Sequence, residues 1–304
     1  MVDADKENNF SEKAPHGAVA ADQEPHQGDI PVQNAITIDL EDWYHGCCAL
    51  APPTVPTERR RVRQNTELIL ALLEECGVRA TFFVLGSVAK LDPSLVPMIA
   101  AAGHEIASHG YSHSLVPLLG PVAFRDELRR TAEIIAEQSG SLPAGFRAPQ
   151  WSLGAATPWA MEILQHEGCL YDSSHNPLPI IGDRRGPRAP FAIRTSAGSI
   201  LELPPMVTPS VIGNLPTGGG WGFRFFPLAL IRRTIKKLNC ARVPAVLYLH
   251  PREMEAFGPR LPLSPLRSFV SYGPRTDAAG RMRDLLRQFK FQTLKELTVT
   301  WQSA

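Results

Sequence analysis

The chain has 304 residues, of which 44% are hydrophobic and 20% are charged, as is typical of a globular protein that can bury a sizeable core. Its 31 basic and 30 acidic residues nearly cancel, so the charge gives no argument for nucleic-acid binding. The five cysteines are scattered and contain no C-x-x-C pair, which argues against a disulfide scaffold and favours a reducing compartment.

Residues 1–33 are polar and show no apolar periodicity, so we predict a disordered N-terminal tail. The first 30 residues contain no apolar run of the signal-peptide type. No stretch approaches the roughly 18–20 apolar residues that a membrane helix needs. We therefore expect a cytoplasmic protein without a transmembrane segment.

Short apolar segments alternate with longer amphipathic ones along the rest of the chain. The apolar segments end in turn signals and predict buried strands. These strands are expected at 35–40, 80–85, 104–108, 145–149, 169–172, 244–250 and 291–294, with a hairpin over 191–203. The amphipathic segments start at capping residues or prolines and often end at glycine, which predicts helices. These helices are expected at 65–76, 93–102, 121–139, 157–167, 227–239 and 276–289.

Two segments predict loops. Residues 218–222 are rich in glycine and are expected to be flexible, and they lack the Lys-Ser/Thr pair of a phosphate-binding loop. Residues 257–275 are rich in proline. The strands are apolar throughout rather than alternating, which is typical of a parallel sheet covered by helices. Six or seven such strand–helix units favour a single α/β barrel over two open sheets.

Polar side chains with catalytic potential follow the C-terminal ends of several expected strands. They are Asp39, Glu41, Asp42, His109, His113, Arg147, Asp172 and His250. Loops at the C-terminal ends of barrel strands meet at one rim, so we expect these side chains to share a site. The alternative, that they are unrelated loop residues, explains one or two of them but not the whole set.

His109 and His113 stand four residues apart, a spacing that can offer two nitrogen ligands to one metal ion. The third ligand is open between two carboxylates. Glu41 shares a face with Asp39 on an extended strand, whereas a bulge or turn would aim Asp42 inward, and we favour Asp42. A divalent ion in such a site polarises a carbonyl and lowers the pKa of water. With a carboxylate base, an arginine beside it and a histidine acid, the set could hydrolyse an amide.

The segments that carry these residues resemble the motifs of the polysaccharide deacetylase family. The matching segments are Thr37-Ile38-Asp39-Leu40-Glu41-Asp42, His109-Gly110-Tyr111-Ser112-His113, Phe146-Arg147-Ala148-Pro149, Asp172-Ser173-Ser174 and Tyr248-Leu249-His250-Pro251. The resemblance covers residues 35–255, and the order of the motifs makes it specific. The forms Ile38-Asp39-Leu40-Glu41-Asp42-Trp43-Tyr44-His45 and Tyr248-Leu249-His250-Pro251 are similar to deacetylases of bacterial exosortase and exopolysaccharide loci. One departure is Leu40, which stands where the family usually has its metal-binding aspartate.

The resemblance implies a deformed barrel of seven to eight strands, of the NodB type, as a single catalytic domain over residues 34–255. Residues 256–304 would form a C-terminal extension packed on the barrel. The family pattern makes Asp39 the general base and Arg147 the residue that orients it. It makes His250 the general acid, tuned by Asp172.

The same resemblance implies metal-dependent hydrolysis of N-acetyl groups from amino-sugar residues of a bacterial polysaccharide or its precursor. Zinc is the first choice of divalent metal, with cobalt, nickel and manganese as alternatives. The expected partner is an N-acetylated polysaccharide or oligosaccharide. Peripheral association with exopolysaccharide machinery is a further expectation. A location at the inner membrane face is expected only because no signal-peptide pattern is seen.

Three aromatic residues near the motifs, Trp43, Tyr44 and Trp151, could form a wall against a sugar ring, with core packing as the alternative. Other functions stay open at this stage. They are a non-catalytic glycan-binding protein of the same fold, a metal-independent cyclic-amide hydrolase and an O-acetyl esterase.

Overall fold

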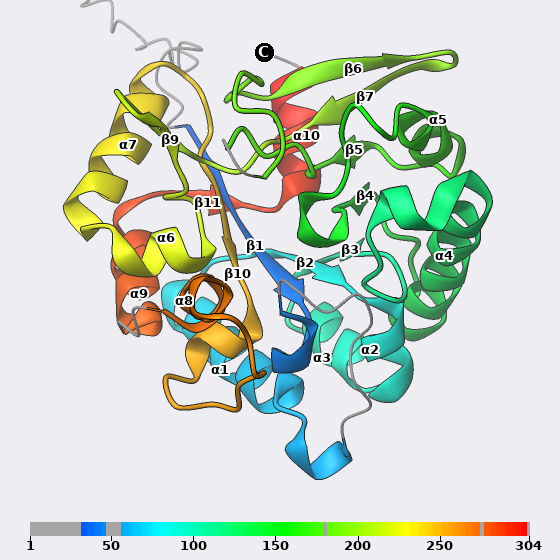
Figure 1. The fold of residues 1–304 in the computed structure, drawn as a ribbon, viewed down its shortest axis with the longest axis horizontal. Coiled ribbons are helices and arrows are strands. Elements are labelled where there is room, and N and C mark those ends of the chain that lie inside the picture. The colour runs from blue at the N-terminus through cyan, green and yellow to red at the C-terminus, as the bar shows by residue number, and fades with distance from the viewer. Residues whose placement is uncertain (1–31, 47–55, 179–180, 274–276, 303–304) are drawn as a thin grey trace, which may run out of the picture. The chain divides into compact units, whose positions relative to one another are not determined.

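One curved sheet organises the residues that the computed structural model describes, which are 32–46, 56–178, 181–273 and 277–302. Its strand order is β10-β1-β2-β3-β4-β5-β7-β6, and β11 pairs with β1 (Figure 1). The strands are β1 (Asn34–Leu40), β2 (Thr81–Val84), β3 (Glu105–Ser108), β4 (Gly145–Phe146), β5 (Tyr171–Asp172), β6 (Phe191–Thr195), β7 (Gly198–Glu202), β10 (Val246–Leu249) and β11 (Phe291–Gln292). A separate two-stranded sheet pairs β8 (Thr208–Ser210) with β9 (Gly213–Leu215).

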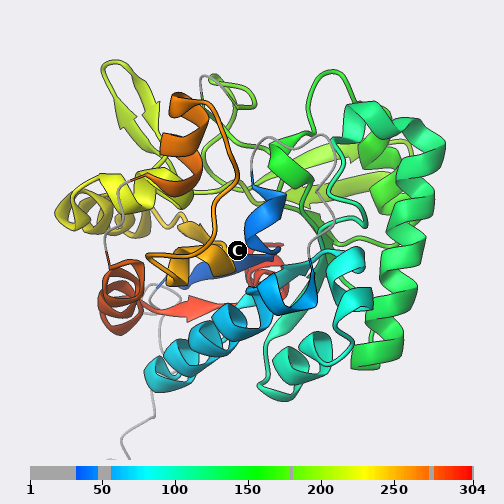
Figure 2. The same cartoon turned by 60° about the horizontal axis from the view of Figure 1, so that its bottom comes forward.

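Helices surround the curved sheet, with α1, α4, α7 and α9 spaced around its outside (Figure 2). The helices are α1 (Val62–Cys76), α2 (Gly86–Leu91), α3 (Leu95–Ala101), α4 (Val116–Ser139), α5 (Trp159–His166), α6 (Gly220–Phe225), α7 (Leu228–Cys240), α8 (Pro265–Tyr272), α9 (Ala278–Gln288) and α10 (Leu294–Gln302). None of these described helices is long and apolar enough to cross a membrane.

Irregular backbone joins the two sides of the sheet. After β7, the amide of Met206 donates to the carbonyl oxygen of Val246 in β10 at 2.8 Å. The amide of Tyr248 donates in turn to the carbonyl oxygen of Gly218 at 2.9 Å. The parallel strands from β10 through β7 are thereby bent into a ring that regular strand pairing does not complete. This confirms the predicted α/β fold with a deformed barrel.

Side chains alternate along β1 between the outside and the inside of the barrel. Ile36, Ile38 and Leu40 belong to the large core formed with the surrounding helices. Ala35 packs with the inner aromatic residues instead. Burial of each large aliphatic side chain contributes about 1.5–3 kcal/mol, so the period of two fixes which face is inside. Asp39, two positions before Glu41, lies on the inner face.

Helix α10, which the sequence did not predict, covers the end of the barrel where the strands begin (Figure 1). Leu294 and Leu297 pack against Ala35 and Val246. Ala35 is the second residue of β1, and Val246 is the first residue of β10. The amide of Leu294 donates to the hydroxyl of Thr81 at 2.8 Å. Functional side chains therefore gather at the opposite end, where the strands finish.

Several predicted elements are corrected by the structure. The helix expected from Pro121 begins at Val116 and kinks at Gly120, whose φ is 70°. Residues 218–222 are not a flexible loop, because α6 begins at Gly220. The expected loop over 257–275 contains α8, which has a proline in its first turn. The predicted tail over 1–33 lies outside the described residues, except for residues 32 and 33.

Candidate metal and catalytic site

Two histidines and one carboxylate converge where the strands end. Glu41 follows β1, His109 follows β3, and His113 lies four residues further on. Their ligand atoms all lie within 4.8 Å of one another, and all three side chains are buried. Nε2 of His113 is 2.7 Å from Oε2 of Glu41. Nitrogen and carboxylate ligands in this number match a divalent metal site that keeps a position open.

His109 is oriented by the backbone that follows β4. Its Nδ1 lies 2.7 Å from the carbonyl oxygen of Arg147. A carbonyl only accepts, so Nδ1 carries the proton and Nε2 keeps a free lone pair, as in many metal-binding histidines. Burial lowers the pKa of His109 to about 4, so its imidazole is neutral at pH 7. Tautomer and charge state both fit a metal ligand.

Glu127 of α4 holds the loop that carries the two histidines. Its carboxylate accepts hydrogen bonds from the backbone amides of Tyr111 and Ser112 and from the Ser112 hydroxyl. His113 has a φ of 65°, a left-handed conformation that few non-glycine residues adopt. Such backbone is held in place by its surroundings and clusters at functional sites. The pair therefore sits on a fixed loop and not on a helical turn.

Asp42, which the sequence favoured as the third ligand, is turned away from the two histidines. Its carboxylate accepts the backbone amide of Trp43 at 2.8 Å and that of Arg61 at 3.1 Å. These bonds cap a short 3-10 helix. Strand alternation continues one step beyond β1, so Glu41 faces the interior as Asp39 does. The preference for Asp42 is corrected to Glu41.

Asp39 is held by a completely buried arginine. Nη1 of Arg147 lies 2.7 Å from Oδ1 of Asp39 and 2.7 Å from the hydroxyl of Thr37. The other nitrogens of Arg147 donate to the backbone and hydroxyl oxygens of Ser173 at 3.0 and 2.8 Å. Burial by itself would raise the pKa of Asp39, but Arg147 and the nearby histidines outweigh it and lower that pKa. Asp39 is therefore ionised at neutral pH and can accept a proton.

His250, which follows β10, faces the same carboxylates from another side. Its Nε2 lies 3.8 Å from Oδ2 of Asp39 and 3.7 Å from Oε1 of Glu41. Its Nδ1 lies 2.8 Å from Oε1 of Glu253. Burial would raise the pKa of Glu253, yet the hydrogen bond from His250 and the charge of Arg224 lower it. An ionised carboxylate on Nδ1 orients the ring and leaves Nε2 facing the site.

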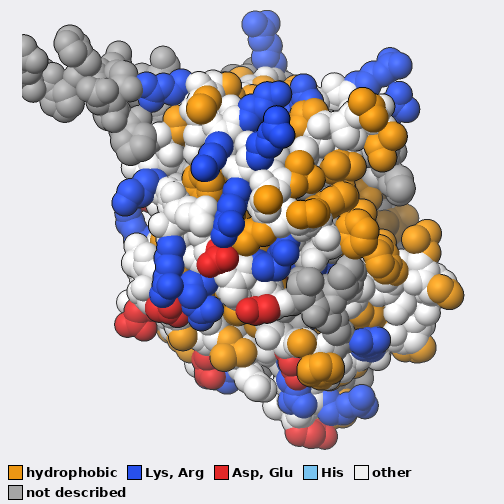
Figure 3. Space-filling view, turned by 90° about the vertical axis from the view of Figure 1, so that its left-hand side faces the viewer, with side chains coloured by type: hydrophobic (Ala, Val, Ile, Leu, Met, Phe, Trp, Pro, Cys, Tyr) orange, Lys and Arg blue, Asp and Glu red, His pale blue; other side chains and the backbone are white. Residues whose placement is uncertain are grey.

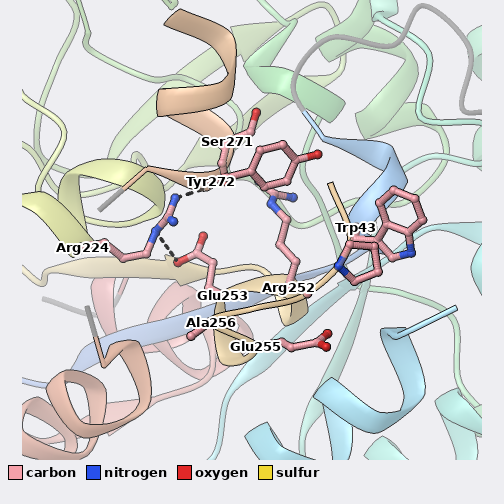
Figure 4. A pocket seen from close by; sticks show the side chains of 10 residues that line it. Trp43, Arg224, Arg252, Glu253, Glu255, Ala256, Ser271 and Tyr272 are labelled. Atoms are coloured by element: carbon pink, nitrogen blue, oxygen red, sulfur yellow. Dashed lines mark hydrogen bonds and ion pairs between the residues drawn. The ribbon is translucent and has the colours of Figure 1, made fainter. Parts of the chain in front are cut away.

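Figure 4 shows the Glu253 side chain pointing toward the guanidinium of Arg224, from which it is separated by 3.8 Å. Arg224 is buried in α6 and donates to the carbonyl oxygens of Gly220 and Gly273. Arg252, beside Glu253, forms an ion pair with Glu41. The turn after β10 therefore supplies both the partner of His250 and a cation for the metal-site carboxylate.

Asp172, predicted to tune His250, supports a different part of the site. Its carboxylate accepts the hydroxyl of Ser174 at 2.6 Å, and that hydroxyl oxygen accepts the amide of Ala148. Burial and the charge of Asp172 raise the pKa of Glu202 well above its usual range. Asp172 thus fixes the backbone next to Arg147. The prediction is corrected, and Glu253 takes the place beside His250.

A cavity of about 260 Å³ lies at this site, and its lining includes Asp39, Glu41, His109, His113 and His250. Trp151 lines it beside Asp39, as the sequence suggested for a sugar-binding residue. Trp221 of α6 and Val270 of α8 form part of its wall, although neither was predicted there. The segments expected to be loops therefore shape the cavity.

Trp43 and Tyr44 do not line this cavity, contrary to the prediction. Both are buried, and their rings pack edge to face with centroids 5.7 Å apart. The indole nitrogen of Trp43 donates to the carbonyl oxygen of Arg59 at 3.0 Å. Their burial and mutual packing favour the open alternative of core packing for these two residues.

The roles of three residues were not predicted from the sequence, namely those of Glu253, Arg252 and Ser173. A signal for Glu253 existed, because Pro251 after His250 favours a tight turn that brings the third residue back toward the histidine. Ser173 carries no comparable signal. Its importance depends on Arg147 reaching across from β4.

Comparisons with known proteins decide the family. A model described as polysaccharide deacetylase matches residues 54–168, and a domain of unknown function, DUF3473, matches residues 173–299. A chitooligosaccharide deacetylase from Rhizobium leguminosarum bv. trifolii is 32% identical over 149 residues, which cover 36% of this chain and 69% of that protein. The chain belongs to the polysaccharide deacetylase family.

Two further relatives of this polysaccharide deacetylase family member match over shorter lengths. A peptidoglycan deacetylase from Helicobacter pylori is 33% identical over 110 residues, covering 36% of each chain. A peptidoglycan-N-acetylglucosamine deacetylase from Bacillus cereus is 36% identical over 98 residues, covering 32% of this chain and 36% of that protein. The chain therefore spans about a third of the length of these curated relatives.

Solved structures agree with the deacetylase fold. A Mycobacterium smegmatis structure assigned to the polysaccharide deacetylases is 25% identical, with a TM-score of 0.56 over 79% of this chain and 77% of that chain. Puue allantoinase has a TM-score of 0.62 over 96% and 99% of the two chains, but its 16% identity shows the fold alone. The predicted family and NodB-type fold are confirmed, whereas the exosortase-locus subgroup stays a prediction.

Proposed function

We propose that this chain removes N-acetyl groups from amino-sugar residues of a bacterial polysaccharide or its precursor by metal-dependent hydrolysis. The observation that carries the proposal is the meeting of three metal-binding side chains with the Asp39–Arg147 pair and His250 around one cavity. The names of the relatives, which state deacetylation of chitooligosaccharides and of peptidoglycan N-acetylglucosamine, support the substrate class.

Glu41, His109 and His113 would hold the divalent ion. Zinc is our first choice because it accepts imidazole nitrogen and carboxylate oxygen, and cobalt, nickel and manganese are alternatives. When bound, such an ion polarises the amide carbonyl and lowers the pKa of water. Burial would raise the pKa of Glu41, but His113, His250 and Arg252 together lower it well below its usual range. The carboxylate is therefore ionised and ready to bind a cation.

The residues around this group move the protons. Asp39 accepts a proton from the attacking water, because Arg147 keeps its carboxylate ionised and fixed. His250 donates a proton to the departing amine from Nε2, the nitrogen that faces Asp39. Glu253 holds the opposite nitrogen and stabilises the charged ring. The carbon–nitrogen bond breaks, and acetate and a free amino sugar leave.

The test is acetate release from defined N-acetylglucosamine oligomers before and after treatment with a chelator. We expect the activity to disappear with the metal and to return when zinc, cobalt, nickel or manganese is added singly. Full activity in protein shown by elemental analysis to be metal-free would overturn the metal dependence. Binding of the oligomer without acetate release by the metal-loaded protein would indicate a glycan-binding protein instead.

The variant Asp39→Asn separates metal binding from catalysis. It should keep its metal, because Asp39 is not one of the three clustered ligands, and it should lose acetate release. An active Asn variant would exclude Asp39 as the base. Parallel assays with O-acetylated sugars and with cyclic amides compare the other reactions that remained open.

Cellular location and partners stay predictions. Association with exopolysaccharide machinery is an expectation from the sequence resemblance, and a location at the inner membrane face is an expectation from the absence of a signal-peptide pattern. Cell fractionation and co-purification with that machinery measure it directly.

A further inference from the structure

A second cavity lies against α7 and residues 207–209. It has a volume of about 620 Å³, within the range of small-molecule sites. The two cavities share no lining residue. Nothing in the proposed hydrolysis uses this second cavity.

Its charged residues are all cationic. Arg188, Arg233 and Lys237 line it, and no acidic residue does. All three are exposed, and none of their side chains has an ion pair or hydrogen bond with another described residue. Arg232, on the same helix, differs in pairing with Asp284 at 3.1 Å. Lys and Arg side chains gather on this face of the molecule, next to hydrophobic ones (Figure 3).

Helix stability does not explain the arrangement. Lys237 lies in the last turn of α7, where a cation favours the helix dipole. Arg233 stands one turn earlier, and Arg188 comes from a different segment. These two therefore have no such reason to face the same cavity.

The inner part of the cavity is apolar. Leu230, Leu238, Val207 and Val243 supply walls, and the buried Thr208 and Thr234 lie between them. Thr234 donates its proton to the carbonyl oxygen of Leu230, so it accepts from Thr208 at 2.7 Å. Thr208 then accepts from the hydroxyl of Thr217 at 2.7 Å. Each of these three threonine hydroxyl protons is therefore donated to another atom of the protein.

We infer that this cavity binds an anionic amphiphile, with a phosphate-type head among the three cations and an apolar chain against the inner walls. The cations are placed at the mouth, where a charged head keeps contact with water. The interior offers hydrocarbon surface and no free hydroxyl proton. Charge-assisted contacts from Arg233 and Lys237 would fix the head.

As a test, the whole 304-residue chain is titrated with dodecyl phosphate below the critical micelle concentration of this detergent, and binding is measured by calorimetry. We expect saturable binding of one molecule per chain. Arg233→Gln and Lys237→Gln should each weaken binding by about tenfold, the usual effect of losing a hydrogen bond to a charged group. Lys236→Gln is the matched control, because Lys236 is exposed on the same helix but does not line the cavity.

The ligands separate the possible sources of binding. Dodecyl maltoside should not bind, and inorganic phosphate should bind far more weakly than dodecyl phosphate. Equal binding of the neutral detergent or of free phosphate would overturn the inference. An equal loss of affinity in Lys236→Gln would also overturn the inference. Together with binding of phosphatidylglycerol vesicles, that loss would indicate a general basic surface instead of a specific cavity. Arg233→Lys should keep most of the affinity, and circular dichroism verifies that each variant is folded.

Discussion

The choice of ligand at the proposed metal site depends on the direction of two neighbouring side chains. Glu41 and Asp42 are adjacent acids, and both are buried. One backbone step decides that Glu41 faces the barrel interior while Asp42 accepts two backbone amides. Both outcomes satisfy a buried carboxylate, so composition cannot distinguish them. The difference is testable one residue at a time.

Glu41→Gln should lose most of its metal on dialysis, since losing one of three charged or imidazole ligands removes a direct bond to the ion. We expect metal affinity to fall by at least about tenfold to a hundredfold, the range found even for supporting residues. Asp42→Asn should keep its metal, because asparagine can still cap the short helix. Elemental analysis measures both. If Asp42→Asn lost its metal and Glu41→Gln kept it, Asp42 would be the third ligand instead of Glu41.

Glu253→Gln tests the partner of His250. Glutamine keeps a hydrogen bond but removes the charge that stabilises the protonated ring. We expect kcat for acetate release to fall by about tenfold to a hundredfold, part of the usual contribution of acid–base catalysis. KM should change little, because Glu253 does not line the catalytic cavity. Glu255→Gln, on the same turn, is the control, and an unchanged kcat in Glu253→Gln would exclude the role.

Short strands carry the proposed catalytic residues, and the packing of these strands positions the site. β4 has two residues, yet Arg147 follows it directly and reaches Asp39 across the barrel. Tyr171 of β5 lies against Gly145 of β4, and its hydroxyl donates to Glu105 at 2.7 Å. The sequence predicted both strands from their apolar residues. It could not predict that one glycine lets the aromatic ring approach the backbone.

Gly145→Ala should destabilise the barrel next to the site. A Cβ at this position would lie 2.0 Å from the Tyr171 ring, which is fully buried and cannot move freely. Overpacking of this kind costs about 1–3 kcal/mol in the free energy of unfolding. Denaturant unfolding measures it. Gly154→Ala is the matched control because its Cβ meets nothing within 4 Å, and equal stability of the two variants would contradict the packing argument.

The whole molecule assembles the site from three separate stretches of sequence. Asp39 and Glu41 precede both family matches, the two histidines lie in the polysaccharide deacetylase match, and His250 lies in the DUF3473 match. Pairing of β10 with β1 brings the last stretch beside the first. The C-terminal segment also supplies Val270 to the cavity wall. The boundary predicted at residue 255 stays a prediction.

Acid should unfold the molecule partly through His104, which lies far from the site. Burial, with the nearby Arg79, lowers the pKa of His104 from 6.5 to about 4. The unfolded chain therefore binds more protons between these values, so the stability that His104 contributes is present above pH 6.5 and is lost as the pH falls toward 4. In chelator-treated protein, the stability of the wild type relative to His104→Asn should decline from pH 7 to pH 5.

Denaturant unfolding at the two pH values measures this difference. Asparagine keeps an acceptor for the backbone amide of Ala80, which donates to His104 at 3.2 Å. His166→Asn, at an exposed position on α5, controls for the removal of a histidine as such. A constant difference between wild type and His104→Asn would show that His104 does not couple folding to protons.

The sequence by itself determined the family and the parallel α/β barrel, and it predicted most of the residues that the structure brings together at the candidate site. Apolar strands that end in acids, histidines and arginine carry that information locally, because parallel strands present their C-terminal ends at one rim. The tertiary structure decided which neighbour faces inward. In the structure, Glu41 instead of Asp42 lies beside the two histidines, and Glu253 instead of Asp172 contacts His250. Trp43 and Tyr44 are buried and pack against each other. Each choice depends on hydrogen-bond partners and buried space supplied by distant segments, which local patterns do not encode.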